Sequence, residues 1–370
     1  MRVPFTVSWY FGQRFLAAVL VVAIGLAGLV ALFDFLELLR ESATAPRSTF
    51  GIVLEIELLR LPWSFMQIIP FAVLLGGIYA FWRLARSSEL VVTRASGISA
   101  WQFLALPALL ALLLGVFCTT AVSPLSATMY GRAGQLYNSY FKPSGGPLSL
   151  NGGSLWVRQA DTGLTQAGIA VLHANDVLLH DKSLQADNVS ILRLTPDNSL
   201  LQRIDASDAT LTHGYWQLRD VQVLKPNMPT QHVGELNFPT DLTANRVQES
   251  FASPNALSFW ALPGFIHLLK HSGFSPIQHE LVFQSLLALP LLCATMALVA
   301  AGFSMRPPRR GDAAAMLGAG VGFGFALFMI SEVANQFGTS GAIPVMLAAW
   351  APALSGLFFA LALLLHLEDG

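Results

Sequence analysis

The chain has 370 residues, of which 54% are hydrophobic and only 12% are charged, with a mean hydropathy of +0.56. A soluble domain carries about 25% charged residues, so this composition argues strongly against a water-soluble monomer. The 21 Lys and Arg and the 22 Asp and Glu residues leave a formal net charge of -1. Because no excess of positive charge attracts a polyanion, the sequence also argues against a nucleic-acid partner.

Uncharged stretches predict six transmembrane helices. A helix needs about 20 apolar residues to cross a hydrocarbon layer of about 30 Å. The stretches that meet this length are 15–33, 61–82, 100–122, 281–305, 313–331 and 342–365. The first is too long for the apolar core of a cleaved signal peptide, and no small-x-small cleavage site follows it, so we interpret it as a span.

Basic residues in the short loops predict the orientation, because Lys and Arg accumulate on the cytoplasmic side. They gather before the first span, between the second and third, and between the fourth and fifth: Arg2, Arg14, Arg83, Arg86, Arg94, Arg306, Arg309 and Arg310. The loop between the fifth and sixth spans has none. We therefore expect both termini in the cytoplasm and the long polar segment after the third span on the other side.

That polar segment has the pattern of a β domain. Apolar and polar residues alternate in short stretches such as 154–159, 169–173 and 215–223, and Gly, Pro and Asn clusters separate them. This alternation predicts half-buried antiparallel strands in a sandwich or a jelly-roll-like fold. The expected domains are 1–122 with spans one to three, 123–279 with the β domain and a return helix, and 280–370 with spans four to six.

Motifs for catalysis are missing from the sequence. No lysine follows a glycine, as a phosphate-binding P-loop requires, and His279-Glu280 is not followed by a second histidine one helical turn later. His267 and His271 lie four residues apart but lack a third candidate ligand nearby. Cys118 and Cys293 stand in apolar runs and are interpreted as buried hydrophobic residues. We expect no catalytic residue, no metal and no cofactor.

A short segment between the second and third spans, 86–97, has the composition of a docking helix. Leu90 lies on one side, and Arg86, Glu89 and Arg94 lie on others. A cytoplasmic partner could receive the apolar side in a groove while Glu89 pairs with a partner arginine. From these residues alone, an ordinary loop is the competing interpretation.

The same segment carries a resemblance to a known family. Glu89-Leu-Val-Val-Thr-Arg-Ala-Ser-Gly97 resembles the SELVVMQASG signature of the lipopolysaccharide export permeases LptF and LptG. Further similarities, nearer to LptG, are 268–273, Pro290, and Gly322-Phe-Gly-Phe325 leading to Glu332. The order of spans and β insert matches as well, so the resemblance covers essentially the whole chain.

The resemblance implies a permease subunit that extracts lipopolysaccharide from the bacterial inner membrane, with its β domain in the periplasm. The implied partners are an LptF-like second permease, an LptB-like cytoplasmic ATPase dimer that hydrolyses the ATP, an LptC-like bitopic protein and a periplasmic LptA-like bridge. The residues implied in coupling to the ATPase are Arg86, Glu89, Leu90, Arg94, Ser96 and Gly97. A mechanotransmission or lipoprotein-release permease, also coupled to an ATPase, is the alternative.

In this family, spans one and five form a lateral gate for the lipid. The residues expected there are Phe33, Asp34, Phe35, Leu36, Glu37, Arg40, Arg132, Gly322, Phe323, Phe325, Phe328 and Glu332. The sequence departs from the family at the outer end of span one, where Asp34 and Glu37 replace the usual lysines and Arg40 alone is basic. The glycines of spans one and five permit close helix approach, either at the gate or in packing within one subunit.

Overall fold

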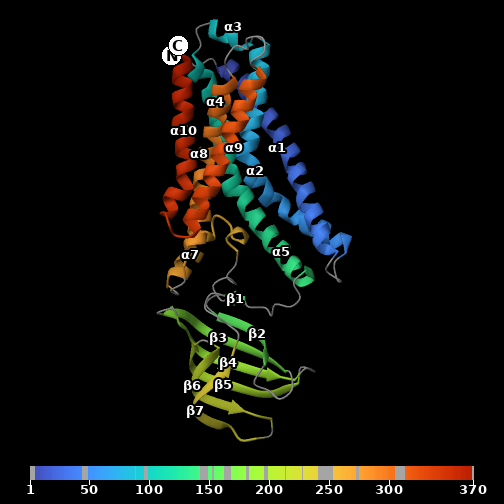
Figure 1. Cartoon of the computed structure of the whole chain (residues 1–370), viewed down its shortest axis with the longest axis vertical. Coiled ribbons are helices and arrows are strands. Elements are labelled where there is room, and N and C mark those ends of the chain that lie inside the picture. The colour runs from blue at the N-terminus through green and yellow to red at the C-terminus, as the bar shows by residue number, and fades with distance from the viewer. Residues whose placement is uncertain are drawn as a thin grey trace. The chain divides into compact units, whose positions relative to one another are not determined.

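The computed structural model describes residues 5–43, 49–87, 89–95, 99–141, 149–151, 154–161, 168–180, 183–195, 199–212, 214–226, 228–240, 253–271, 275–304 and 313–368. The chain divides into two compact units (Figure 1). The helical unit comprises Met1–Phe141, Pro254–Pro263 and Ile277–Gly370, and the β unit comprises Lys142–Ser253 and Gly264–Pro276.

The helical unit is built from long apolar helices. They are α1 (Phe5–Ser42), α2 (Phe50–Arg86), α3 (Glu89–Ala95), α4 (Ala100–Phe117), the π-helical turn η1 (Cys118–Val122), α5 (Ser123–Phe141), the short 3₁₀ turn η2 (Pro254–Ala256), α8 (Ile277–Ser304), α9 (Ala313–Thr339) and α10 (Val345–Glu368). Among the described residues, six segments are long and apolar enough to cross a membrane, which confirms the six predicted spans: Ser8–Ser42, Phe50–Arg86, Trp101–Phe141, Ile277–Ser304, Gly318–Thr339 and Val345–His366.

The third of these segments is longer than its uncharged stretch, because α4, η1 and α5 form one continuous helical run. We expected the β domain to begin at Ser123, but the helix continues to Phe141 and the β unit begins at Lys142. The polar residues of α5 mark where the apolar stretch ends. They do not end the helix, because its backbone hydrogen bonds form equally well beyond the hydrocarbon layer.

Two prolines inside this bundle lack the backbone N–H of other helical residues, and other segments supply hydrogen bonds close to them. Pro290 in α8 has no N–H for the carbonyl of Leu286, which accepts a hydrogen bond from the Thr119 hydroxyl at 2.9 Å. Close to Pro124, which also lacks an N–H, the carbonyl of Thr120 accepts a hydrogen bond from the indole N–H of Trp260 at 3.2 Å. Both hydrogen bonds involve residues of η1, the turn that joins α4 to α5 and contacts α8.

Close backbone contacts fix the packing of the bundle. A Cβ at Gly115 of α4 would lie 2.5 Å from the Cα of Pro290 in α8, and one at Gly76 of α2 would lie 2.6 Å from the Cα of Val19 in α1. Only glycine permits these approaches. The core between the helices includes Phe15 and Phe81, and Cys118 and Cys293 are both buried in it as free thiols.

The β unit contains one antiparallel sheet. Its strands are β1 (Ser149–Asn151), β2 (Ser154–Asp161), β3 (Gly168–His180), β4 (Ser183–Leu194), β5 (Leu200–Thr212), β6 (Tyr215–Leu224) and β7 (Gln231–Pro239). Each described strand pairs with the next in sequence, so the sheet is an up-and-down meander. Gly214, with φ of +88°, provides the tight turn between β5 and β6. The antiparallel all-β insert predicted from the sequence is confirmed.

The sheet curls around a single core. Alternate residues of β2 to β7, with Trp216 the largest, bury their side chains in one cluster. Helix α7 (Leu262–His271), most of which belongs to this unit, adds Leu269 to that cluster. The curl brings Gln159 of β2 close to the end of β7. The Gln159 amide donates a hydrogen bond to the carbonyl of Pro239 at 2.9 Å, and the Thr240 hydroxyl donates to Gln159 Oε1 at 2.5 Å.

Candidate functional site

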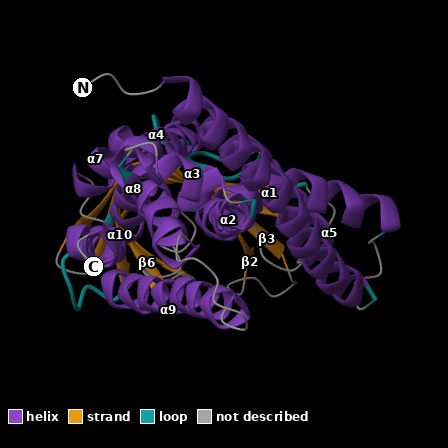
Figure 2. Cartoon of the chain, turned by 90° about the horizontal axis from the view of Figure 1, so that it is seen from above, coloured by secondary structure: helices purple, strands orange, loops and turns teal. Residues whose placement is uncertain are grey.

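Helices α1 and α9 have the least covered apolar surfaces of the six spans. In the most apolar window of each, 17% of the residues are buried, against 67% in α2. Helix α1 packs along α2 and α4, and α9 packs along α8 and α10, so that α2 lies between α1 and α9 (Figure 2). The described chain therefore leaves apolar faces of two spans uncovered.

The outer end of α1 is partly apolar and partly acidic. Phe33 is 64% exposed, and Leu36 is also exposed. Phe35 turns inward and meets Phe50 of α2 edge-to-face, with ring centroids 5.7 Å apart. Asp34 is half-buried. The remaining predicted residues of this end, Glu37 and Arg40, are exposed. The structure thus separates Phe35, which packs within the bundle, from Phe33 and Leu36, which face outward.

The aromatic residues of α9 divide in the same way. Phe325 is 59% exposed, whereas Phe323 is stacked on Phe359 of α10 with centroids 4.2 Å apart. Phe328 is partly exposed and meets Phe71 of α2 edge-to-face at 5.2 Å. Glu332 is exposed and accepts a hydrogen bond from Gln336 at 3.3 Å. Of the three predicted gate phenylalanines of α9, Phe325 is the most exposed, and Phe323 is a packing residue.

The glycines of α9 form two registers with different surroundings. Cβ atoms at Gly320 and Gly324 would meet Ile78 and Leu74 of α2. Cβ atoms at Gly318 and Gly322 would meet nothing within 4 Å, and the same holds for Gly25 and Gly28 of α1. The first register therefore serves packing within the subunit, and the second leaves a smooth open surface.

A cavity of about 480 Å³ lies between α2, α5, α8, α9 and α10. Its walls are mainly apolar and include Trp63, Phe71 and Phe328. Gln67 and Glu332 belong to the polar part of its lining. This cavity was not predictable from the sequence, because its residues come from five helices and the segment at η2. The signal in the sequence was the presence of polar side chains in otherwise apolar spans.

Charged residues gather where α1, α2 and α5 meet. Arg132 forms an ion pair with Glu55 at 3.5 Å. The Tyr137 hydroxyl donates to Glu41 at 2.9 Å. Glu57 of α2 is 4% exposed, and within the described part of the chain neither carboxylate oxygen has a hydrogen-bond partner. Arg132, which the resemblance implies at the lateral gate, is thus engaged by a carboxylate in the isolated chain.

The segment predicted to dock a partner contains α3. Arg86 is exposed, with its guanidinium 5.4 Å from the centroid of the Trp82 ring. Glu89 accepts a hydrogen bond from the Ser87 hydroxyl at 2.9 Å through Oε1, whereas Oε2 is buried and has no partner among the described residues. Leu90 and Arg94 lie in the helix, and Ser96 and Gly97 lie outside the described residues.

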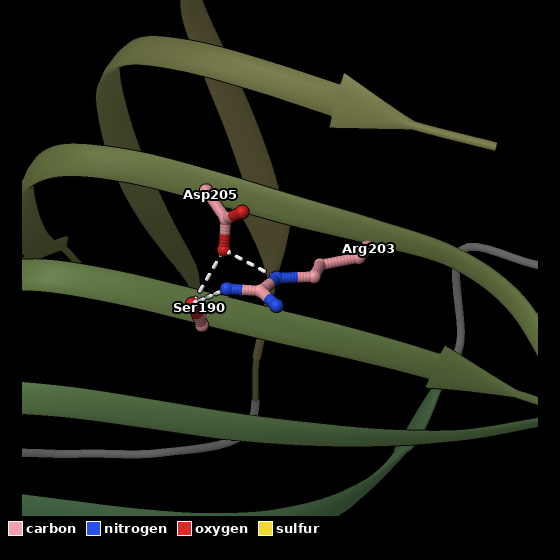
Figure 3. A network of polar contacts seen from close by, with 3 residues as sticks. All are labelled: Ser190, Arg203 and Asp205. Carbon is pink, nitrogen blue, oxygen red and sulfur yellow. Dashed lines mark hydrogen bonds and ion pairs between the residues drawn. The ribbon is translucent and has the colours of Figure 1, made fainter. Parts of the chain in front are cut away.

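Polar clusters in the β unit have structural explanations. Figure 3 shows Ser190 of β4 donating to Asp205 of β5, while Arg203 donates to Asp205 at 2.9 Å and to Ser190 at 3.3 Å. A nucleophilic serine needs an adjacent base to accept its proton, and here an arginine engages the only carboxylate. The cluster joins two strands. Among the described residues, no group of three or more His, Cys, Asp or Glu side chains could hold a metal ion.

Comparisons with known proteins agree with this architecture. The family described as lipopolysaccharide export system permease LptF/LptG matches residues 9–366. The chain is 25% identical over 364 residues to the lipopolysaccharide export system permease protein LptG of Escherichia coli K12, covering 96% of this chain and 97% of that protein. It is 24% identical over 364 residues to LptG of Haemophilus influenzae, covering 94% and 95%. With six apolar helices, an inserted β sheet and a match along nearly its whole length, the chain belongs to the LptF/LptG family of lipopolysaccharide export permeases.

Proposed function

We propose that this chain is the LptG-like half of a two-permease transporter that draws lipopolysaccharide out of the inner membrane. The observation that carries the proposal is the pair of uncovered apolar faces on α1 and α9. Helix α2, which contacts both, is largely buried. A second, LptF-like permease placed against these faces would enclose a space between the two subunits. The open glycines Gly318 and Gly322 support a close approach of that partner.

The chemistry of the cargo explains why such a space must be apolar. Each buried methylene holds a lipid in the bilayer by about 0.8 kcal/mol, so one chain of about twelve carbons resists extraction by about 10 kcal/mol. Exposed side chains such as Phe33 and Phe325 replace the bilayer contacts that the lipid loses. The subunit therefore needs no active site. An LptB-like ATPase dimer bound near α3 supplies the energy.

The proposed orientation places both termini and α3 in the cytoplasm and the β unit in the periplasm. The basic residues Arg14, Arg83 and Arg86 support it, because they stand at the α3 ends of α1 and α2. In this orientation the β unit receives the lipid and passes it to an LptC-like protein and an LptA-like bridge.

Photo-crosslinking from two neighbouring positions of α9 tests this function. We would replace Phe325 or Phe323 with p-benzoyl-phenylalanine and irradiate cells that make the full transporter. The two positions share a helix and a side-chain type but differ in exposure. We expect a lipopolysaccharide adduct from position 325 and a much weaker one from position 323.

Equal adducts at both positions would show that the reagent reacts without regard to the proposed path. No adduct at 325, with the variant present in normal amount in the membrane, would contradict lipid passage along the open face of α9. Co-expression of an ATPase that cannot hydrolyse ATP distinguishes lipid that enters the space from lipid that moves through it.

A further inference from the structure

A second cavity, of about 560 Å³, lies at the other end of the helical unit, between α1 and α2 beside the start of α3. Its polar lining comes from two tyrosines, two arginines, a serine and a glutamate: Tyr10, Arg14, Tyr79, Arg83, Ser87 and Glu89. The expected lipid gate uses none of them, and only Ser87 and Glu89 lie in the segment expected to bind the ATPase.

The two arginines give this cavity a positive character. Arg14 and Arg83 are both exposed, and neither forms an ion pair with a residue that the structure describes. The guanidinium of Arg14 lies 5.3 Å from the centroid of the Tyr10 ring, which restricts its position. Glu89 is the single carboxylate of the lining, and its Oε1 is engaged by the Ser87 hydroxyl. The lining carries one more positive than negative charge.

The uncharged stretches of the sequence indicate where this cavity lies relative to the membrane. Arg14 directly precedes the first long uncharged stretch, and Arg83 directly follows the second. Both guanidinium groups therefore lie at the boundary between water and hydrocarbon. Toward the hydrocarbon, the wall of the cavity consists of the small apolar residues Ala18, Val21 and Val22 of α1, and Val21 is 71% exposed.

We propose that this cavity binds an anionic phospholipid, with the headgroup phosphate between Arg14 and Arg83 and an acyl chain along the small apolar residues of α1. Basic pockets between transmembrane helices on the cytoplasmic side are suited to anionic headgroups. Guanidinium groups donate paired hydrogen bonds to phosphate oxygens. A free phosphate ion shares this chemistry, but the apolar wall that continues into the lipid-facing surface of α1 favours a lipid. The proposed orientation enters only in assigning the site to the cytoplasmic leaflet.

Native mass spectrometry of the full chain in a neutral detergent tests this site. The purified protein would be mixed with equal amounts of phosphatidylglycerol and phosphatidylethanolamine, which differ in net charge but not in acyl chains. We expect the first bound phosphatidylglycerol to be retained preferentially. Since each arginine near an anionic group contributes about a fivefold gain in affinity, Arg14→Gln with Arg83→Gln should weaken that binding about 25-fold.

Two matched variants separate the site from general effects of charge. Arg86→Gln removes a neighbouring arginine that does not line the cavity and should keep the preference for phosphatidylglycerol. Arg14→Lys with Arg83→Lys keeps the charge and should retain most of this preference. An unchanged thermal unfolding midpoint of the double glutamine variant checks that this variant folds. Inorganic phosphate forms a further arm of the experiment.

The outcomes are decisive in both directions. Equal retention of the two lipids by the unmodified protein would overturn the proposal without any variant, as would undiminished phosphatidylglycerol binding to the double glutamine variant. Binding of inorganic phosphate that depends on both arginines, without preference for phosphatidylglycerol, would replace the lipid by a free ion. None of these measurements depends on lipopolysaccharide transport, so they can fail while the proposed function stands.

Discussion

Glu89 is the residue on which the proposed coupling to an ATPase depends most directly. One of its carboxylate oxygens is engaged by Ser87, and the other is buried without a partner among the described residues. A partner arginine that reached this oxygen would form a charge-assisted hydrogen bond in a partly desolvated place. In the proposed complex, a partner residue would complete the hydrogen bonding of this carboxylate.

Replacing Glu89 with alanine should release the ATPase from the transporter. Truncating one member of a buried charge pair costs about 2–5 kcal/mol, much of it from the charge left unpaired. The measurement is the amount of ATPase that co-purifies with the tagged permease, relative to the amount of permease in the membrane. Membrane insertion should be unaffected, since the residue lies outside the apolar spans.

Glu332→Ala provides the matched control, because Glu332 is an exposed carboxylate at the opposite end of the helical unit. That variant should retain the ATPase. If Glu89→Ala also retained it at equal abundance, Glu89 would be an ordinary charge at the start of a short helix and the coupling assignment would be wrong at this residue.

Individual residues were only partly predictable from the sequence. The signature around Glu89 was recognisable, but the different directions of Phe323 and Phe325 were not, because apolar residues surround both in a helix that is apolar on all sides. Glu57 was missed for a related reason. Its burial depends on the packing of α2 against neighbouring helices, and sequence spacing does not specify which face of a membrane helix is covered.

At the scale of elements, the turn η1 between α4 and α5 supplies hydrogen bonds at places where prolines interrupt the backbone hydrogen bonding of helices. Thr119 donates its hydroxyl to the carbonyl that Pro290 leaves free in α8, whereas the Thr120 hydroxyl bonds within its own helix to Val116 at 2.8 Å. The two neighbouring threonines therefore contribute differently to the fold.

Thr119→Val should destabilise the helical unit, and Thr120→Val should have little effect. Valine has nearly the shape of threonine but no hydroxyl, so the first change leaves the partly buried carbonyl of Leu286 unpaired, at a cost of about 1 kcal/mol. Thermal unfolding of the detergent-solubilised protein, compared between the two variants, measures the difference. Equal midpoints would mean that water or relaxation of α8 replaces the hydroxyl.

The existence of the six spans followed from hydropathy, whereas their true lengths did not. Stretches without charge show where hydrocarbon surrounds a helix, but a helix ends only where its backbone geometry changes. Helix α5 was therefore not predicted, because polar residues follow the third uncharged stretch. The positions of the strands were predictable because β2, β3 and β6 contain stretches of broadly alternating residues that Gly, Pro and Asn clusters separate. The single curled sheet was not predictable, because strand order does not change the alternation within a strand.

For the molecule as a whole, the proposed orientation predicts which loops a protease reaches. A cleavage site for a specific protease, inserted after Asp161 between β2 and β3, should be cut when the enzyme is added to spheroplasts with an intact inner membrane. The same site inserted after Ser304, between α8 and α9, should be cut only in inverted vesicles. The reverse pattern would mean that both termini and α3 face the periplasm.

The lengths of the helices have a consequence for how a lipid leaves the bilayer. At 1.5 Å per residue, α1 with 38 residues and α2 with 37 are about 55 Å long, close to twice the thickness of the hydrocarbon layer. Their outer ends are held together with α5 by a small core of their own, which contains Leu38, Ile56 and Ala133. In the proposed orientation, these packed ends form a three-helix extension above the membrane, with Phe33 and Leu36 exposed on its surface. An acyl chain that followed the proposed path along this extension would exchange bilayer for protein contacts a few methylenes at a time, which would divide the free-energy cost of extraction into small steps.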